Sequence, residues 1–270
     1  MNLLFIPTLL FSLVLFVVGQ KISRCGDSRW FIIGSLVAAI PAVVFAAYYT
    51  KTFGEAKWFY LFRALPCTEL SAAGIGLFAG WLQCKRQQSL RLKRRVSAFF
   101  IPFLMVLCVS APYLKQLFLR PDWGKFENRW VDDVCLQSSE SSCGPAAAAT
   151  LLRRFGKSAT ELEIAQASFT TRRGTENWYL LRTIRQHGLA VNYAVAAPGV
   201  ENIMFPSIAG VRLNLARSSG HFITLLGKNG EKLVVGDPLN GREELTREEL
   251  EERYTFTGFY LIHTDAGGLK

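Results

Sequence analysis

The first 118 residues alternate between long apolar runs and short basic loops. Residues 3–19, 30–50 and 97–114 carry no charged side chain. Residues 58–83 are apolar apart from Arg63 and Glu69. A membrane-spanning helix needs about 20 mainly apolar residues. The pattern therefore predicts an all-α transmembrane region of about four helices over residues 1–118, with spans near 3–19, 30–50, 58–83 and 97–118.

The first apolar run has a second interpretation, as a cleaved signal peptide. It lacks a basic segment before the apolar run and an A-x-A-like cleavage site. Both absences favour a permanent anchor.

The predicted third span is the most polar of the four, because it contains Arg63, Pro66 and Glu69. Proline breaks or kinks a helix, and charges at membrane depth usually face a partner or a cavity. One interpretation is therefore a polar site or a re-entrant turn. We favour the other, in which residues 58–65 lie at the membrane surface, Arg63 extends to the headgroups, and the span begins near Glu69.

The positive charge belongs to the apolar half. Residues 1–120 hold 14 of the 31 Lys and Arg residues but only 3 of the 21 Asp and Glu residues. Residues 121–270 are therefore nearly neutral. These basic residues lie between apolar runs, which is typical of membrane proteins and argues against a nucleic-acid partner. The loops at 20–29 and 84–95 hold three and six Lys or Arg, against two in the loop at 51–57. We expect an integral membrane protein of a bacterial plasma membrane, with both termini outside the cytoplasm.

The second half has the pattern of a globular α+β domain. Residues 119–133 are polar and aromatic and are predicted to form a linker, and residues 134–270 are predicted to form the domain. Three helices are predicted. The first begins after Cys143, and the second begins at a capping box formed by Ser158 and Glu161. The third begins at an N-cap on Thr175 and ends before Gly188. Short β-branched and aromatic segments then predict antiparallel strands at 190–196, 206–213, 221–227, 232–237 and 256–263, with a short helix at 246–253.

Four residues of this domain could form a catalytic site. Cys143 begins a helix, where unpaired N–H groups favour loss of the thiol proton. His221 opens a strand and Asp237 closes the next, so a hairpin around residues 227–232 brings them together. Gln137 could donate its amide N–H to an oxyanion. His187 is explained by a helix C-terminus instead, and His263 has no acidic residue placed to meet it.

These residues lie in motifs that resemble those of the bacteriocin-processing cysteine peptidases. The motifs are Gln137, Cys-Gly-Pro-Ala six residues later, Gly-His-Phe, and Asp-Pro-x-x-Gly, in that order. The resemblance covers roughly residues 131–265 and implies a papain-like fold. It also implies that Cys143 is the nucleophile, His221 the general base and acid, Asp237 its orienting partner, and Gln137 the oxyanion-hole donor. The substrate would then be a peptide or protein.

The chain departs from that family in two ways. Its members are best known as leader-cleaving modules fused to ABC transporters, but no Walker A motif occurs here and the domain follows the membrane region. The same residues could also serve a silent peptide-binding module for a membrane partner, or a transpeptidase or amidase. No metal-binding pattern or phosphate-binding loop is present, so no cofactor is expected.

Each candidate residue also has a plainer explanation. Cys143 could be a buried structural thiol, and His221 a strand-end histidine bonded to the backbone. Asp237 before Pro238 could form an Asx turn, a role compatible with orienting a histidine. Cys135 could pair with Cys143 as a redox switch, although a small buried side chain is the simpler interpretation.

Overall fold

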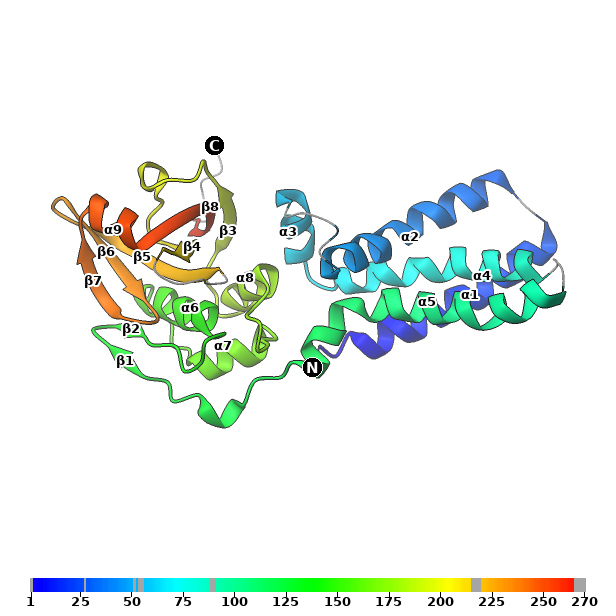
Figure 1. Ribbon diagram of the computed structural model, residues 1–270, viewed down its shortest axis with the longest axis horizontal. Coiled ribbons are helices and arrows are strands. Elements are labelled where there is room, and N and C mark those ends of the chain that lie inside the picture. The colour runs from blue at the N-terminus through cyan, green and yellow to red at the C-terminus, as the bar shows by residue number, and fades with distance from the viewer. Residues whose placement is uncertain are drawn as a thin grey trace. The chain divides into compact units, whose positions relative to one another are not determined.

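The chain folds into two compact units, shown as a computed structural model in Figure 1. The structure describes residues 2–26, 28–50, 52, 56–87, 91–214 and 220–264. Met1–Ala56 and Leu65–Phe118 form the helical unit, and Lys57–Ala64 and Leu119–Lys270 form the mixed unit. The predicted loop at 51–57 and the domain's last six residues lie largely outside the described part.

The helical unit is built from apolar helices. They are α1 (Phe5–Cys25), α2 (Arg29–Tyr49), the 3-10 helix η1 (Thr68–Gly74), α4 (Ile75–Gln87) and α5 (Arg91–Phe118). Among the described residues, three helices are long and apolar enough to cross a membrane: Phe5–Cys25, Arg29–Tyr49 and Ala98–Phe118. A fourth span results only if Lys57–Ala64 and Thr68–Gln87 are counted together as one broken span.

Helices α1 and α4 pack closely through glycine. A Cβ atom added at Gly76 would lie 2.2 Å from the Ser12 carbonyl oxygen, and one added at Gly80 would lie 2.0 Å from that of Phe16. Gly76 and Gly80 are four residues apart and therefore share one face of α4. Small residues at this spacing let helix backbones approach each other in a membrane environment.

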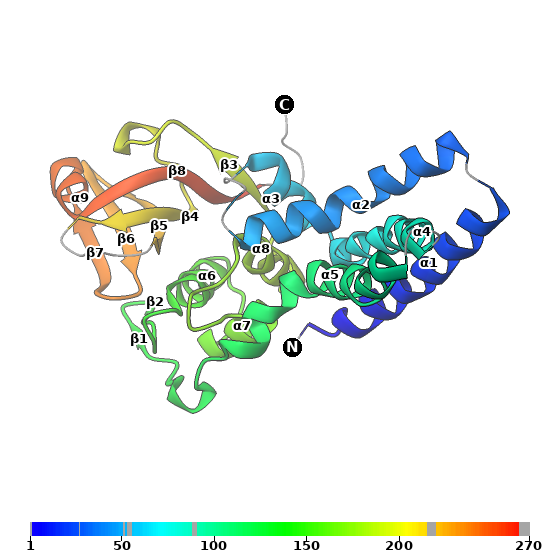
Figure 2. The same cartoon turned by 45° about the vertical axis from the view of Figure 1, so that its right-hand side comes forward.

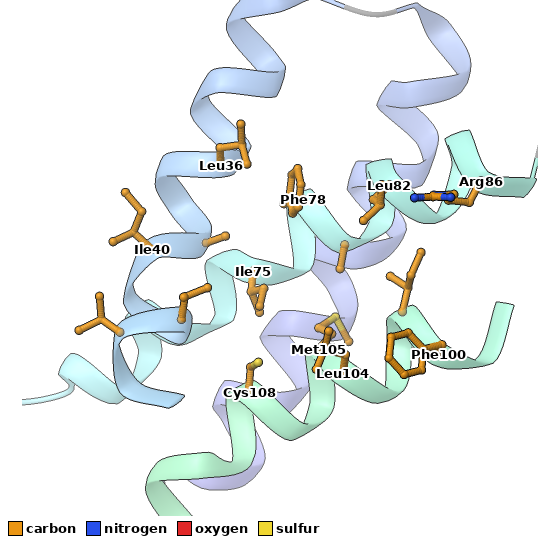
Figure 3. Close-up of a pocket in the computed structure, with 15 residues that line it drawn as sticks. Leu36, Ile40, Ile75, Phe78, Leu82, Arg86, Phe100, Leu104, Met105 and Cys108 are labelled. Carbon is orange, nitrogen blue, oxygen red and sulfur yellow. The ribbon is translucent and has the colours of Figure 1, made fainter. Parts of the chain in front are cut away.

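An apolar cavity of about 830 Å³ lies between α2, α4 and α5 (Figure 3). Side chains such as Leu36, Phe78 and Leu104 line it, with Arg86 near one end.

The predicted third span, 58–83, is not one helix. Helix α3 (Lys57–Ala64) ends before Pro66 and belongs to the mixed unit, whereas Thr68–Gln87 belongs to the helical unit. Our expectation that Arg63 extends to the headgroups is wrong. Its side chain is fully buried, donates to the Tyr179 hydroxyl at 3.2 Å, and lies 5.2 Å from the ring centre of Trp178. The planar guanidinium stacks on aromatic rings, which explains how a charge is accommodated there.

Three further helices of the mixed unit form where the sequence predicts helices, although two caps differ. These are α6 (Cys143–Arg154), α7 (Glu161–Ala167) and α8 (Asn177–Gln186). The capping box before α7 is formed by Thr160 and Glu163, not by Ser158 and Glu161. The N-cap of α8 is Glu176 and not Thr175, whose hydroxyl lies 2.7 Å from that of Thr170.

The sheet contains the five predicted strands and one more. They are β3 (Val191–Val195), β4 (Ser207–Leu213), β5 (His221–Asn229), β6 (Lys232–Asp237), β7 (Gly241–Leu245) and β8 (Tyr254–His263). All neighbours are antiparallel, in the order β3-β8-β4-β5-β6-β7. The sequence pattern does not predict strand β7, because its sequence, GREEL, is mostly charged. Helix α9 (Arg247–Arg253) follows it, and β1 (Trp130–Val131) and β2 (Val134–Cys135) form a separate small ribbon.

Successive side chains of β5 point to opposite faces of the sheet, and both faces are buried there. The Thr224 hydroxyl donates to the Ala147 carbonyl at 2.9 Å, which fixes β5 against α6. Its neighbours Ile223 and Leu225 point the other way, into a cluster with Leu250 of α9. Figures 1 and 2 both place α6 and α7 on the same side of this sheet. The beginning of α6 is thereby held near the end of β5 that carries His221.

Candidate active site

Cys143 is the first residue of α6, as the sequence predicts. Its side chain is 8% exposed and its thiol is free. The preceding residue, Ser142, makes no side-chain cap. The first N–H groups of a helix have no partner within it and carry partial positive charge. A thiol at this position therefore lies where a negative charge is favoured.

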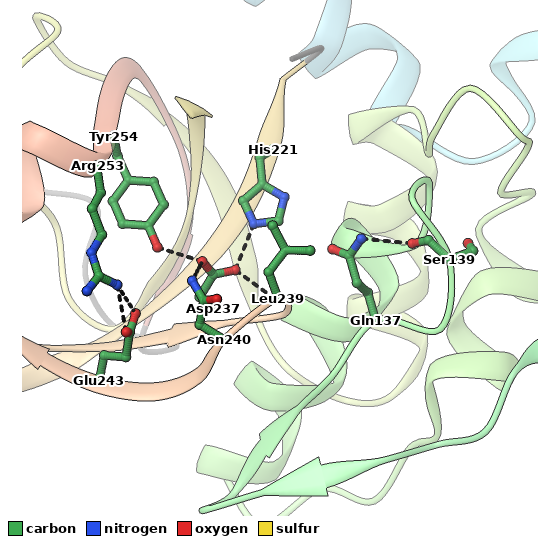
Figure 4. A network of polar contacts seen from close by, with 9 residues as sticks. All are labelled: Gln137, Ser139, His221, Asp237, Leu239, Asn240, Glu243, Arg253 and Tyr254. Atoms are coloured by element: carbon green, nitrogen blue, oxygen red, sulfur yellow. Dashed lines mark hydrogen bonds and ion pairs between the residues drawn. The ribbon is translucent and has the colours of Figure 1, made fainter. Parts of the chain in front are cut away.

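His221 and Asp237 meet at one end of the sheet. Because β5 and β6 form an antiparallel hairpin, the first residue of one lies near the last residue of the other. The His221 Nε2 atom lies 2.8 Å from Asp237 Oδ1 (Figure 4). Both side chains are buried, with 6% of His221 and none of Asp237 exposed. Nδ1, the other ring nitrogen of His221, takes no part in this contact.

Three further donors bind the Asp237 carboxylate. One of them also shows that Asp237 forms an Asx turn, the simpler role considered for it above. The Leu239 N–H donates to Oδ1 at 2.9 Å, which is the Asx turn expected before Pro238. The Tyr254 hydroxyl and the Asn240 amide donate to Oδ2 at 2.6 and 3.1 Å (Figure 4). The turn and the contact with His221 therefore coexist, and the carboxylate has little freedom to rotate.

The pKa values of this pair move in opposite directions. Burial alone lowers the pKa of His221, but hydrogen bonds to Asp237 and Cys143 and attraction to both raise it to about 9. Burial alone raises the pKa of Asp237, but His221, the Tyr254 hydroxyl and the Leu239 N–H together bring it below its ordinary value. The pair therefore favours an imidazolium beside a carboxylate at neutral pH.

Gln137 is anchored to the loop that follows Asp237. Its backbone N–H donates to the Pro238 carbonyl at 2.8 Å. Its side-chain amide donates to the Ser139 carbonyl at 2.9 Å (Figure 4). An amide NH₂ carries two hydrogens, so one N–H remains to donate to another oxygen.

Cys135 lies in β2 and is fully buried. Burial and the nearby charge of Glu161 raise its pKa to about 12, against a smaller opposing effect of Arg153. Such a thiol stays protonated at neutral pH and is a poor nucleophile. Both Cys135 and Cys143 are free thiols in the structure.

The other two histidines occupy different surroundings. His187 caps the end of α8, where its Nδ1 lies 2.9 Å from the Thr183 carbonyl oxygen, as expected of a helix C-terminus. The ring of His263 packs on Phe155 with centres 4.2 Å apart. The ring of His221 is paired with the Asp237 carboxylate, Nε2 to Oδ1.

Tyr254 and Asn240 are site residues that the sequence did not reveal. Tyr254 is 17 positions beyond Asp237 and reaches it only because β8 is part of the same sheet. Asn240 lies in the Asp-Pro-x-x-Gly motif, so the motif itself could have identified it. In the described residues, no group of three or more His, Cys, Asp or Glu side chains could hold a metal ion.

Comparison with known proteins identifies relatives of the mixed unit. The sequence model of the peptidase C39 family matches residues 132–266, half of the chain. An uncharacterized protein of Methanothermobacter marburgensis is 32% identical over 136 residues, which cover 48% of this chain and 88% of that protein. A second, from Methanothermobacter thermautotrophicus, is 29% identical over 133 residues, or 48% of this chain and 86% of that one.

Solved structures similar to this chain are peptidase domains. One is a double glycine motif protease from an AMS/PCAT transporter in complex with the leader peptide. It is 25% identical and covers 48% of this chain and 89% of that one, with a TM-score of 0.41. Another is the peptidase domain of Streptococcus ComA, a bifunctional ABC transporter. It is 18% identical over 48% of this chain and 95% of that one, with a TM-score of 0.41.

Proposed function

Because this chain belongs to the peptidase C39 family, we propose that it is a membrane-anchored cysteine peptidase that cleaves a peptide or protein by acyl transfer to Cys143. The observation that carries the proposal is the buried His221–Asp237 pair, with Cys143 at a helix N-terminus contributing to the raised pKa of His221. A structural thiol and a structural histidine do not require this arrangement.

The reaction follows from the roles that the geometry allows. The Cys143 thiolate attacks the substrate carbonyl carbon, and the electron pair of the C=O bond moves to the oxygen. The free N–H of Gln137 and the backbone N–H of Cys143 stabilise this oxyanion. His221, charged and oriented by Asp237, donates its proton to the amine that leaves. It then accepts a proton from the water that hydrolyses the acyl-enzyme.

The helical unit would hold the peptidase at a membrane. We assign residues 1–118 to the membrane region, apart from α3 (Lys57–Ala64) of the mixed unit, residues 119–133 to a linker and residues 134–270 to the peptidase domain. Three helices long and apolar enough to span a membrane support the anchor. Counted with the broken fourth span of Lys57–Ala64 and Thr68–Gln87, the basic loops support a peptidase domain on the outer side of a plasma membrane. The substrate would then be a peptide or protein segment near the membrane surface.

A cleavage assay with a diverse mixture of peptides tests the proposal. The purified full chain is incubated in detergent with a proteome-derived peptide library, with and without an added amine, and separately with cell-wall peptides. New peptide termini are identified by mass spectrometry. We expect termini that appear with wild type and disappear with Cys143→Ala. Binding of peptides without cleavage would favour the peptide-binding module, and products joined to added amines would favour a transpeptidase. Cleavage of cell-wall peptides alone would favour an amidase.

A further inference from the structure

Glu161 is a buried carboxylate that the proposed reaction does not use. It is the first residue of α7 and its side chain is fully buried. Oε1 accepts the Ser138 backbone N–H at 2.8 Å, and Oε2 accepts the Ser138 hydroxyl in a short hydrogen bond. Burying a carboxylate costs free energy that an exposed one avoids, so its position calls for a partner such as this.

Glu161 is not needed to cap its own helix. The Thr160 hydroxyl accepts the Glu163 N–H, and the Glu163 carboxylate accepts the Thr160 N–H at 2.8 Å. This complete capping box is exposed to solvent. The carboxylate of Glu161 instead binds a segment 23 residues earlier in the chain.

The segment that Glu161 binds is the one that carries Gln137. Ser138 directly follows Gln137, whose backbone N–H is bonded to the Pro238 carbonyl at 2.8 Å. The Ser138 hydroxyl oxygen also accepts the Glu127 N–H at 3.0 Å. Residues 137 and 138 are therefore held from two sides, by the loop after Asp237 and by α7. Charge-assisted hydrogen bonds such as those to Glu161 are the stronger class.

We propose that Glu161 is a positioning residue for the oxyanion hole. By fixing Ser138, its carboxylate keeps the neighbouring Gln137 amide directed at the oxygen of the tetrahedral intermediate. This inference rests on the proposed function, and it assigns Glu161 a part in holding the oxyanion and none in forming the Cys143 thiolate. The two effects can be measured separately.

Two probes of Cys143 separate these effects. Iodoacetamide alkylates a thiolate by displacement of iodide and forms no oxyanion. The Cys143 thiolate adds to the carbonyl carbon of the aldehyde acetyl-glycyl-glycinal, and the oxygen takes a proton from the charged His221 to give a hemithioacetal. This oxygen lies where the oxyanion would. Both are measured on the full chain in detergent, for wild type, Glu161→Gln and Ser138→Ala. The matched control is Glu163→Gln, which makes the same change two residues away and keeps a side chain that supports a capping box.

We expect Glu161→Gln to weaken aldehyde binding at least about tenfold, since small misplacements of catalytic groups have large effects on reaction. Its alkylation rate should stay within about twofold of wild type, and the control should match wild type with both probes. Ser138→Ala, which removes one of the two bonds, should act in the same direction but less.

Two results would overturn the inference alone. One is unchanged aldehyde binding in Glu161→Gln and Ser138→Ala while wild type reacts with both probes. The other is an equal fall with both probes, which would make Glu161 a purely structural residue. If wild-type Cys143 itself reacts with neither probe, the proposed function fails, and this inference fails with it.

Discussion

His221 and Asp237 lie on neighbouring antiparallel strands with Nε2 and Oδ1 2.8 Å apart, and both side chains are buried. Sixteen residues separate them in sequence, and the hairpin β5–β6 returns the chain over that interval. The contact occupies one ring nitrogen of His221, and Cys143 contributes with Asp237 to the raised pKa of this histidine. The pKa of His221 and the pH dependence of stability therefore both depend on this pair.

Asp237→Asn keeps the shape of the side chain and removes its charge. The pKa of His221, about 9 in the folded protein, should fall toward the ordinary value of about 6.5. An imidazole NMR titration measures this directly. An unchanged titration would contradict the assignment of Asp237 as the partner that charges His221.

The same pair predicts how stability varies with pH. Because the folded pKa of His221 is raised to about 9, its contribution to stability is fully present below about pH 6.5 and is lost as the pH rises through about 9. The folded pKa of Asp237 is lowered, so its contribution is lost as the pH falls through that lowered value. The difference in free energy of unfolding between wild type and Asp237→Asn should therefore be large near pH 6 and shrink above pH 9. A constant difference over that range would contradict the pairing.

Tyr254→Phe removes the hydroxyl that donates to Asp237 Oδ2 at 2.6 Å. Loss of a buried hydrogen bond to a charged group costs about 1.5–3 kcal/mol. The control is Tyr260→Phe, since Tyr260 lies on the same strand, is also buried, and its hydroxyl has no hydrogen-bond partner in the described part of the chain. Denaturant unfolding should show a loss of stability for the first variant and little change for the second. Equal effects would mean that the bond to Asp237 adds no stability.

Arg63→Ala tests the docking of α3 in the mixed unit. The substitution removes the hydrogen bond to the Tyr179 hydroxyl and the stacking on Trp178. We expect faster amide hydrogen exchange in α8, because its aromatic residues lose a packed neighbour. Leu61→Ala, on the 43% exposed Leu61 of the same helix, should leave that exchange unchanged. Unchanged exchange in both variants would show that α3 does not support α8.

Gly80→Ala tests the close packing of α1 on α4. The added Cβ would meet the Phe16 carbonyl oxygen at 2.0 Å, so one helix must move. Overpacking of this kind costs about 1–3 kcal/mol. Gly34→Ala is the matched control, because a Cβ at Gly34 in α2 meets no atom within 4 Å. Thermal unfolding of the full chain in detergent should be affected only by the first change; an equal effect would argue against the close contact.

Local signals explain why much of the site could be predicted. Cys143 is marked by a Cys-Gly-Pro step before an alanine-rich helix, and His221 and Asp237 by strands on either side of a turn at Gly230. A single hairpin is enough to bring His221 and Asp237 together, and short-range sequence patterns specify hairpins well.

Long-range contacts explain what the sequence did not reveal. The bond from Tyr254 to Asp237 depends on the order in which distant strands pair. Glu161 is one of several acidic residues near a helix start, and its burial depends on how α7 packs. Helix α3 belongs to an apolar run, and hydropathy alone cannot distinguish a membrane segment from a helix that packs on a folded unit.

The most direct test of the central claim is the rate of Cys143 alkylation by iodoacetamide near pH 6, read by mass spectrometry in wild type and His221→Ala. A charged imidazole beside the thiol stabilises its thiolate, and the thiolate is the species that reacts. We expect wild type to react much faster than the variant at this pH. Equal rates in the two proteins would contradict a thiolate–imidazolium pair and with it the assignment of Cys143 as a nucleophile.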